Sequence, residues 1–177
     1  MKKRVQRRCL VIDASVAQAA GTLGARNLRG VHCRDFLVTV RGVCHHMAWS
    51  EALRVEWEKH ESPFAIQWRV TMTNLKKLRP VAGELSQELR REINGHSKDK
   101  NVVAIMVKDA HLVEAALATH KRVASLDDQV RAHFSRLAGS FHVLRAVVWI
   151  NPSIEEEEAI EWLDEGAPDE RFRRLGR

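Results

Sequence analysis

Residues 108–128 constrain the fold of this chain more than any other stretch. Apolar residues recur there at helical spacing (Leu112, Val113, Ala116 and Leu117), and Asp109 stands where an N-cap would. Residues 122–125 then form an apolar segment too short for a helix, and Asp127 follows at the start of a second helical pattern. A helix, a buried strand and a further helix joined by short turns are typical of an α/β sheet.

The rest of the chain continues this alternation of strands and helices. We expect strands over 9–12, 45–49 and 145–150, and helices over 30–41, 50–60, 63–79, 82–93 and 128–137. Residues 95–101 are expected to form a loop. Residues 102–107 are either a strand or an irregular approach to the helix at Asp109. Strand–helix alternation implies right-handed crossovers, so we predict a three-layer α/β/α sandwich around a parallel sheet of four to five strands.

Length and composition favour one domain with an appendage in a reducing compartment. The chain has 177 residues, and its three cysteines form no C-x-x-C pair. No apolar run approaches the length of a membrane span, and Asp13 interrupts the apolar segment 9–12 that follows the basic first residues. We therefore expect a cytoplasmic protein with no signal peptide and no membrane segment.

Charge divides the chain at residue 151. Residues 1–151 hold 25 basic and 14 acidic residues, a net charge of +11, whereas residues 152–177 carry a net charge of −5. We predict a body over 1–151 and an acidic helical tail over 152–177, with Ser153 as its N-cap and acids in its first turn. The tail is expected to dock on the body or on a second copy of the chain. The basic body suggests a nucleic-acid partner, although a solvated surface tuned for solubility explains the charge equally well.

Four acidic residues are expected at or beside the carboxyl edge of the sheet: Asp13, Glu56, Asp109 and Asp127. Ligands bind at that edge in open parallel sheets. Crowded carboxylates repel one another unless a cation or shared protons relieve them, and Mg²⁺ or Mn²⁺ prefer oxygen ligands. Taken singly, Asp109 and Asp127 are equally well explained as helix N-caps, and Glu56 as a solvated helix residue.

These acids lie in motifs that resemble the PIN-domain family of ribonucleases. The matching segments are Val11-Ile-Asp13-Ala-Ser15, residues 50–57, residues 108–118 and residues 123–128, and together the resemblance spans about residues 8–150. The resemblance implies an α/β/α sandwich that cleaves RNA with Mg²⁺ or Mn²⁺, with the four acids as the metal site and Ser15 orienting a ligand or water. Many members are toxins of toxin–antitoxin pairs, which implies a protein antitoxin as a partner.

The sequence departs from the family pattern at several points. Glu51 competes with Glu56 as the second acid, and the usual Thr-x-Asp appears as Ser125-Leu-Asp127, where Asp128 could substitute or assist. The segment 63–100 is longer and more basic than in small toxins, and the acidic tail is additional. These differences put the toxin role and the antitoxin partner in question.

Basic residues concentrate around the inserted segment and beside Asp109. We expect these residues either to follow an RNA backbone or to form a solvated helical face. They are Lys76, Lys77, Arg90, Arg91, Lys98, Lys100 and Lys108. Cysteines and histidines near residues 32–46 match no compact zinc pattern.

The sequence thus predicts a metal-dependent endoribonuclease. The main alternative is a non-catalytic RNA-binding or assembly module with the same fold. A phosphatase is disfavoured because Asp13-Ala-Ser15 lacks the second aspartate of an Asp-x-Asp signature.

Overall fold

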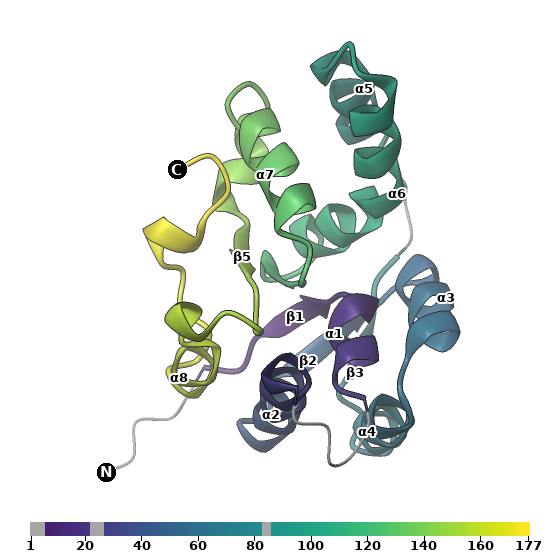
Figure 1. Ribbon diagram of the computed structural model, residues 1–177, viewed down its shortest axis with the longest axis vertical. Helices are drawn as coiled ribbons and strands as arrows, with labels where there is room; N and C mark the ends of the chain where they lie inside the picture. Colours follow the sequence, from purple (N-terminus) through teal and green to yellow (C-terminus); the bar gives the residue numbers. More distant parts are fainter. Residues whose placement is uncertain (1–5, 22–26, 83–85) are drawn as a thin grey trace.

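A five-stranded parallel sheet organises the computed structural model, which describes residues 6–21, 27–82 and 86–177 (Figure 1). All four strand pairings are parallel, and the order across the sheet is β3-β2-β1-β4-β5. The strands are β1 (Cys9–Ile12), β2 (His46–Trp49), β3 (Leu78–Pro80), β4 (Arg122–Ala124) and β5 (Val148–Ile150). The predicted sandwich with a parallel sheet is confirmed.

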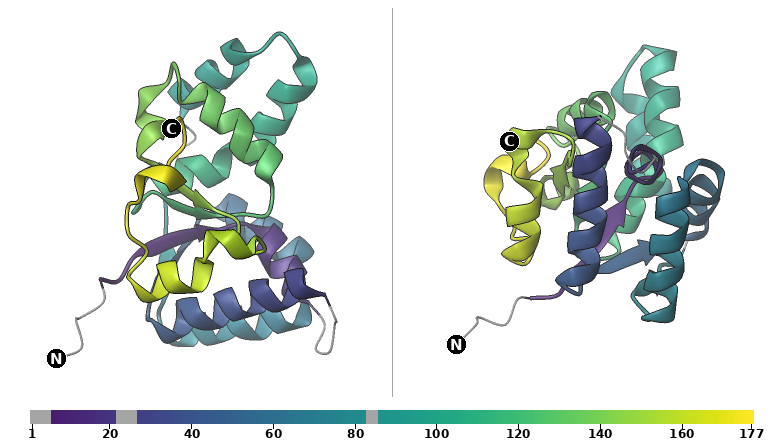
Figure 2. Two further views of the ribbon diagram at one scale, coloured as in Figure 1. Left: turned by 60° about the vertical axis from the view of Figure 1, so that its left-hand side comes forward. Right: turned by 60° about the horizontal axis from the view of Figure 1, so that its bottom comes forward.

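Helices cover both faces of the sheet, as Figure 2 shows from two sides. One layer contains α1 (Ala14–Ala19), α2 (Leu28–Gly42), α4 (Pro63–Asn74) and α8 (Ala159–Asp164). The opposite layer contains α5 (Gln87–His96), α6 (Lys100–Leu117) and α7 (Asp128–Leu137). None of the helices in the parts of the chain that the structure describes is long and apolar enough to cross a bilayer.

Alternate strand residues point into two separate hydrophobic cores, as the pleat of a strand requires. Leu10 and Ile12 belong to the core on the α2 side, whereas Cys9 and Val11 belong to the core on the α6 side. The helix α3 (Glu51–His60) contributes to both cores, with Trp57 in the first and Leu53 in the second. It therefore connects the two helical layers.

The direction of strand order reverses between β1 and β4. From β1 the chain continues to β2 and β3 on one side, and from β4 it continues to β5 on the other. The carboxyl ends of these two central strands are joined by a hydrogen bond of 2.9 Å from Asp13 N to Ala124 O. Such a reversal point opens a crevice outside the strand ends, where ligands bind in sheets of this kind.

The helix that carries Asp109 begins ten residues earlier than predicted, because α6 starts at Lys100 and its N-cap is not Asp109. Its N-cap is Asp99, whose side chain accepts a hydrogen bond of 2.9 Å from Asn101 N. Residues 102–107 are therefore helical, and Asp109 is not an N-cap but lies within α6. Buried Met106 and Ala110 extend the apolar stripe of the helix toward its N-terminus. Packing therefore overrides the strand tendency of the valines in residues 102–107.

Two other element boundaries differ from the predictions. The helix predicted over 63–79 ends at Asn74, and residues 78–80 form the edge strand β3 after Lys76 adopts a φ of 54°. Pro80 is tolerated as the last residue of an edge strand. The strand predicted over 145–150 begins at Val148, because residues His142–Ala146 form a 3₁₀ helix. The predicted helix over 82–93 is observed over Gln87–His96, and residues 83–85 lie outside the described parts.

The tail does not form the single helix predicted from Ser153. Residues Glu155–Glu157 form a 3₁₀ turn, and α8 begins only at Ala159. Ser153 N and Oγ both donate to Asn151 Oδ1, at 3.0 and 2.7 Å, so these residues form a local turn where a helix start was predicted.

The tail docks on the body, which is one of the two arrangements that the sequence left open. Trp162 and Leu163 join the α2-side core, and Leu175 joins the α6-side core. Leu175 N donates to Val147 O at 2.9 Å, and Arg174 forms an antiparallel bridge with Val148. The end of the chain thus covers the exposed edge of β5, which removes an edge that could pair with other chains.

Candidate functional site

A cleft of about 220 Å³ lies at the carboxyl edge of the sheet, where the strand order reverses. The ends of β1 and β4 and the helices α1, α3 and α6 contribute to its walls. All four acids predicted from the sequence line it: Asp13, Glu56, Asp109 and Asp127. Residues separated by as many as 114 positions in the chain are therefore assembled by the fold into one site.

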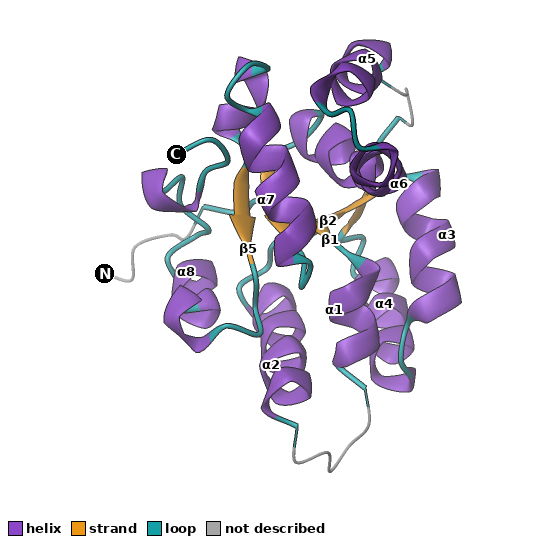
Figure 3. Cartoon of the chain, turned by 45° about the horizontal axis from the view of Figure 1, so that its top comes forward, coloured by secondary structure: helices purple, strands orange, loops and turns teal. Residues whose placement is uncertain are grey.

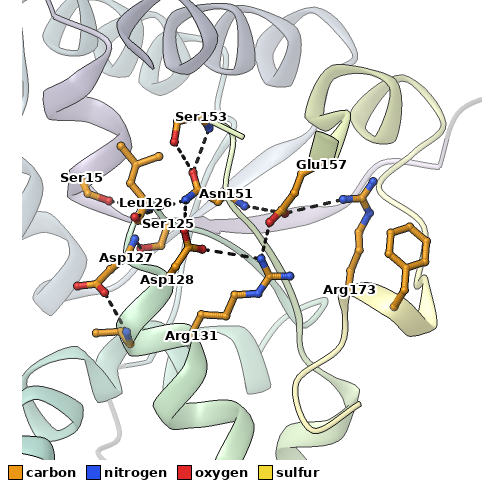
Figure 4. Close-up of polar contacts among 12 residues, drawn as sticks. Ser15, Ser125, Leu126, Asp127, Asp128, Arg131, Asn151, Ser153, Glu157 and Arg173 are labelled. Carbon is orange, nitrogen blue, oxygen red and sulfur yellow. Dashed lines mark hydrogen bonds and ion pairs between the residues drawn. The ribbon is translucent and has the colours of Figure 1, made fainter. Parts of the chain in front are cut away.

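Asp13 is fixed by two serine hydroxyls. Its Oδ2 accepts from Ser15 Oγ at 2.5 Å and from Ser125 Oγ at 2.8 Å. Ser15 Oγ in turn accepts from Leu126 N, and Ser125 Oγ accepts from Asp127 N, both at 3.2 Å (Figure 4). These bonds connect the ends of β1 and β4 and hold the Asp13 carboxylate in one orientation. Ser15, predicted to orient a ligand or water, here orients Asp13.

Asp109 enters the cleft from α6 in an environment that disfavours its charge. Burial raises the pKa of its carboxyl to about 6, and the negative charges of Asp13 and Asp127 add to the rise. The positive charge of Lys108 is the strongest opposing influence on this pKa. The three aspartates are therefore electrostatic neighbours and not merely residues of one cavity.

Glu56, not Glu51, is the glutamate of α3 that faces this cleft. Its Oε2 lies 3.6 Å from Nε2 of His60, one helical turn further along. Glu51 is exposed and forms an ion pair with Arg54 outside the cleft. The position of Glu56 within the helix thus decides between the two acids.

Asp127 is both a helix cap and a residue of the cleft wall. Its Oδ1 accepts from Val130 N at 2.9 Å and so caps α7, and the residue also lines the cleft. Asp128, predicted to assist, does not line the cleft. Its Oδ2 accepts from Asn151 Nδ2 at 2.9 Å, and Oδ1 lies 3.9 Å from Arg131 (Figure 4).

The predicted basic residues separate into three groups. Lys108 lines the cleft itself. Arg91, Lys98 and Lys100 are exposed on α5 and at the start of α6, which project above the sheet in Figure 1; Arg90, on α5, is paired with Glu114 at 3.1 Å. Lys76 and Lys77 precede β3 and therefore lie at the amino edge of the sheet, opposite the cleft.

Three further polar residues line the cleft and were not singled out from the sequence: Gln18, His60 and His111. Each lies three or four positions after a candidate residue on the same helix, so helical spacing is the signal that could have identified them. His111 is almost fully buried, with Nδ1 3.0 Å from Lys108 O. That contact identifies Nδ1 as the protonated nitrogen, since a carbonyl oxygen can only accept.

The donor set fits a hard cation that keeps much of its water. Within residues 6–21, 27–82 and 86–177, no three Asp, Glu, His or Cys side chains are grouped closely enough to hold one ion between them. Mg²⁺, however, is usually bound through one or two carboxylates and retains several waters. Asp13 and Asp109, presented to a small polar cleft, meet that requirement.

Replacing Ser125 by alanine is expected to destabilise the protein by about 1–2 kcal/mol. Asp13 would lose one of its two hydroxyl donors, and Asp127 N would lose its acceptor. Urea denaturation measures the change, with Ser135→Ala on the partly exposed face of α7 as a control that should stay within about 0.5 kcal/mol. Equal effects of the two substitutions would show that the Ser125 hydroxyl does not hold the site.

Comparison of the chain with protein-family models, curated proteins and solved structures finds no match.

Proposed function

We propose that this chain is a metal-dependent endoribonuclease of PIN type, which hydrolyses RNA phosphodiester bonds at the carboxyl-edge cleft. One observation carries the proposal: four acids from four separate elements line a single cleft at the point where the strand order reverses. The same proposal includes a cytoplasmic location, which the composition favours, and as partner either a protein antitoxin, which the resemblance implies, or a second copy of the chain.

Gathering these acids costs stability, which favours a functional explanation. Asp109 is held where burial and two neighbouring carboxylates oppose its ionisation. The ionised Asp109 is destabilised at this position, and groups whose pKa values are shifted in this way concentrate in functional sites. A divalent cation would relieve the repulsion that the three aspartates exert on one another.

The four acids Asp13, Glu56, Asp109 and Asp127 would hold Mg²⁺ or Mn²⁺ together with water. When bound, such a cation polarises a phosphodiester and makes water a better nucleophile. The chain's own contributions are orientation and charge. Ser15 and Ser125 fix Asp13, the α7 cap fixes Asp127, and Lys108 places a cation where a phosphate would enter.

RNA would approach across the exposed basic side chains of α5 and of the start of α6. This surface, together with the +11 charge of residues 1–151, would contribute sequence-independent phosphate binding. Lys76 and Lys77 lie too near the opposite edge of the sheet to join this path.

The test is incubation of the purified protein with 5′-labelled single-stranded RNA, in Mn²⁺ or in chelator, beside Asp13→Asn and the control Asp35→Asn. Asp35 is exposed on α2, outside the cleft. We expect cutting that requires metal, survives in the control and is lost in Asp13→Asn. RNA binding that persists in chelator without cutting would point instead to a non-catalytic module, and phosphate release from mononucleotides to a phosphatase.

A further inference from the structure

A second chamber adjoins the acidic cleft and continues it between α3 and α6. Its volume is about 480 Å³, and it shares three lining residues with the cleft: Glu56, Lys108 and His111. Figure 3 shows α3 beside both α6 and α1. The two cavities therefore adjoin at these shared residues, and Lys108 lines both of them.

The second chamber differs from the cleft in chemistry. Side chains of α3 and α6 and the residue after β3 give it apolar walls: Ala52, Val55, Ala115 and Val81. Val55 is 49 % exposed, so part of this apolar wall is open to solvent. An apolar hollow that opens to solvent beside a charged cleft is suited to a flat, largely apolar group joined to an anion.

A fixed ion pair supplies the chamber's polar wall. Glu114 accepts from Arg90 Nε at 3.1 Å and from Arg90 Nη2 at 3.3 Å, and it also accepts from Ser86 N at 3.1 Å. Both carboxylate oxygens are thus engaged, and the guanidinium is held in place. Arginine has five N–H donors, so those that Glu114 does not use are available to ring nitrogens or carbonyl oxygens of a ligand.

We propose that this second chamber binds the nucleobase of a nucleotide whose phosphate occupies the acidic cleft. The inference rests on the proposed function in one respect, since that function places a phosphate beside Lys108. The apolar walls bury the faces of the base, and Arg90 contacts its edge. Lys108, at the junction, binds the phosphate that connects the two halves of the ligand.

The proposal predicts that nucleoside 5′-monophosphates bind in the presence of Mg²⁺ at least about tenfold more tightly than ribose 5-phosphate, because only the former carry a base to bury. Isothermal titration with AMP, UMP and ribose 5-phosphate measures the difference. Ala52→Phe, which fills the chamber from an exposed position of α3, is expected to remove this advantage and leave ribose 5-phosphate binding unchanged. Ala104→Phe, exposed on α6 and lining neither cavity, is the matched control.

The outcome is separable from that of the RNA-cleavage assay. A nucleotide preference that Ala52→Phe removes supports the base chamber even if the protein cuts no RNA, in which case the proposed function alone fails. Nucleotides that bind no better than ribose 5-phosphate, or not at all, overturn the inference even if RNA is cut. A preference that Ala52→Phe leaves intact also overturns it, because the base then binds elsewhere.

Discussion

Asp109→Asn is expected to make the metal-free protein more stable by about 2 kcal/mol at pH 7.5 while reducing metal-dependent RNA cleavage at least about 100-fold. Asparagine keeps the shape of the side chain but carries no charge, so it avoids the burial and repulsion that raise the pKa of Asp109 to about 6. The stability figure is smaller than the full pKa difference implies, because the side chain is partly exposed and solvent screens its interactions.

The stability gain must depend on pH in a definite direction. The pKa of Asp109 rises from 3.8 to about 6 on folding, so the folded state keeps a proton that the unfolded state loses between these values. The wild type therefore loses stability as pH rises through this window, and Asp109→Asn does not. We expect the difference between the two proteins to be about a third of its plateau value near pH 4.5 and to reach the plateau above about pH 6.5.

Urea denaturation in chelator at pH 4.5 and 7.5 measures this difference, with Asp35→Asn as an exposed control that should show neither the gain nor its pH dependence. If the difference in unfolding free energy between Asp109→Asn and the wild type is the same at both pH values, the folded environment does not oppose the ionisation of Asp109. The cleavage assay is a separate readout, since loss of activity in a more stable protein excludes misfolding as the cause.

The sheet could be predicted because its strands are short, apolar and bounded by strong signals. Residues 9–12 and 122–124 lack alternation, as central strands buried on both faces do, and the α7 helix was bounded correctly by the Asp127 cap. In contrast, β3 has only three residues, two of them exposed, and ends in proline. Its identity as a strand comes from pairing with Met47, Ala48 and Trp49, and no local pattern encodes that contact.

The course of α6 and of the tail depended on competition between nearby groups. Both Asp99 and Asp109 are chemically capable N-caps, and the packing of Met106 and Ala110 on the α6-side core favours the earlier one. Likewise Ser153 is a good cap in isolation, but its main-chain N and its hydroxyl both donate to Asn151 Oδ1 in a local turn. From the sequence, candidate N-cap residues can be compared only by residue type. In the folded chain, the groups within hydrogen-bonding and packing distance decide which of them caps a helix.

The acids of the site were predictable as a set because parallel strands deliver their carboxyl ends to one edge. Asp13 and Asp127 follow adjacent strands, and Glu56 lies on the helix that follows β2. The second chamber was not predictable, because its apolar walls come from surfaces of α3 and α6 that meet only in the folded chain. Single alanines and valines on helices carry no sign of the cavity that they will line.

Glu157→Gln is expected to destabilise the protein by about 2–3 kcal/mol, because it removes the charge around which the tail is joined to the body. Glu157 Oε1 lies 2.5 Å from Arg131 Nη1, Oε2 lies 3.9 Å from Arg173 Nη1, and Oε2 also accepts from Asn151 N at 2.9 Å (Figure 4). Arg173 is only 5 % exposed, so its charge depends on the acids around it. The remaining pairs, with Asp128 and Glu170, limit the loss.

The same substitution should weaken the candidate site. Asn151, whose main chain Glu157 holds, donates from Nδ2 to Asp128 Oδ2 at the start of α7, immediately after Asp127. We therefore expect RNA cleavage to fall by roughly tenfold, which is the loss typical of residues that orient metal ligands without binding the metal themselves. Glu155→Gln, exposed in the same turn, should change neither stability nor cleavage. Denaturation in urea with 1 M salt completes the test: a surface pair would already be screened there, so the effect of Glu157→Gln must persist if the pair is buried.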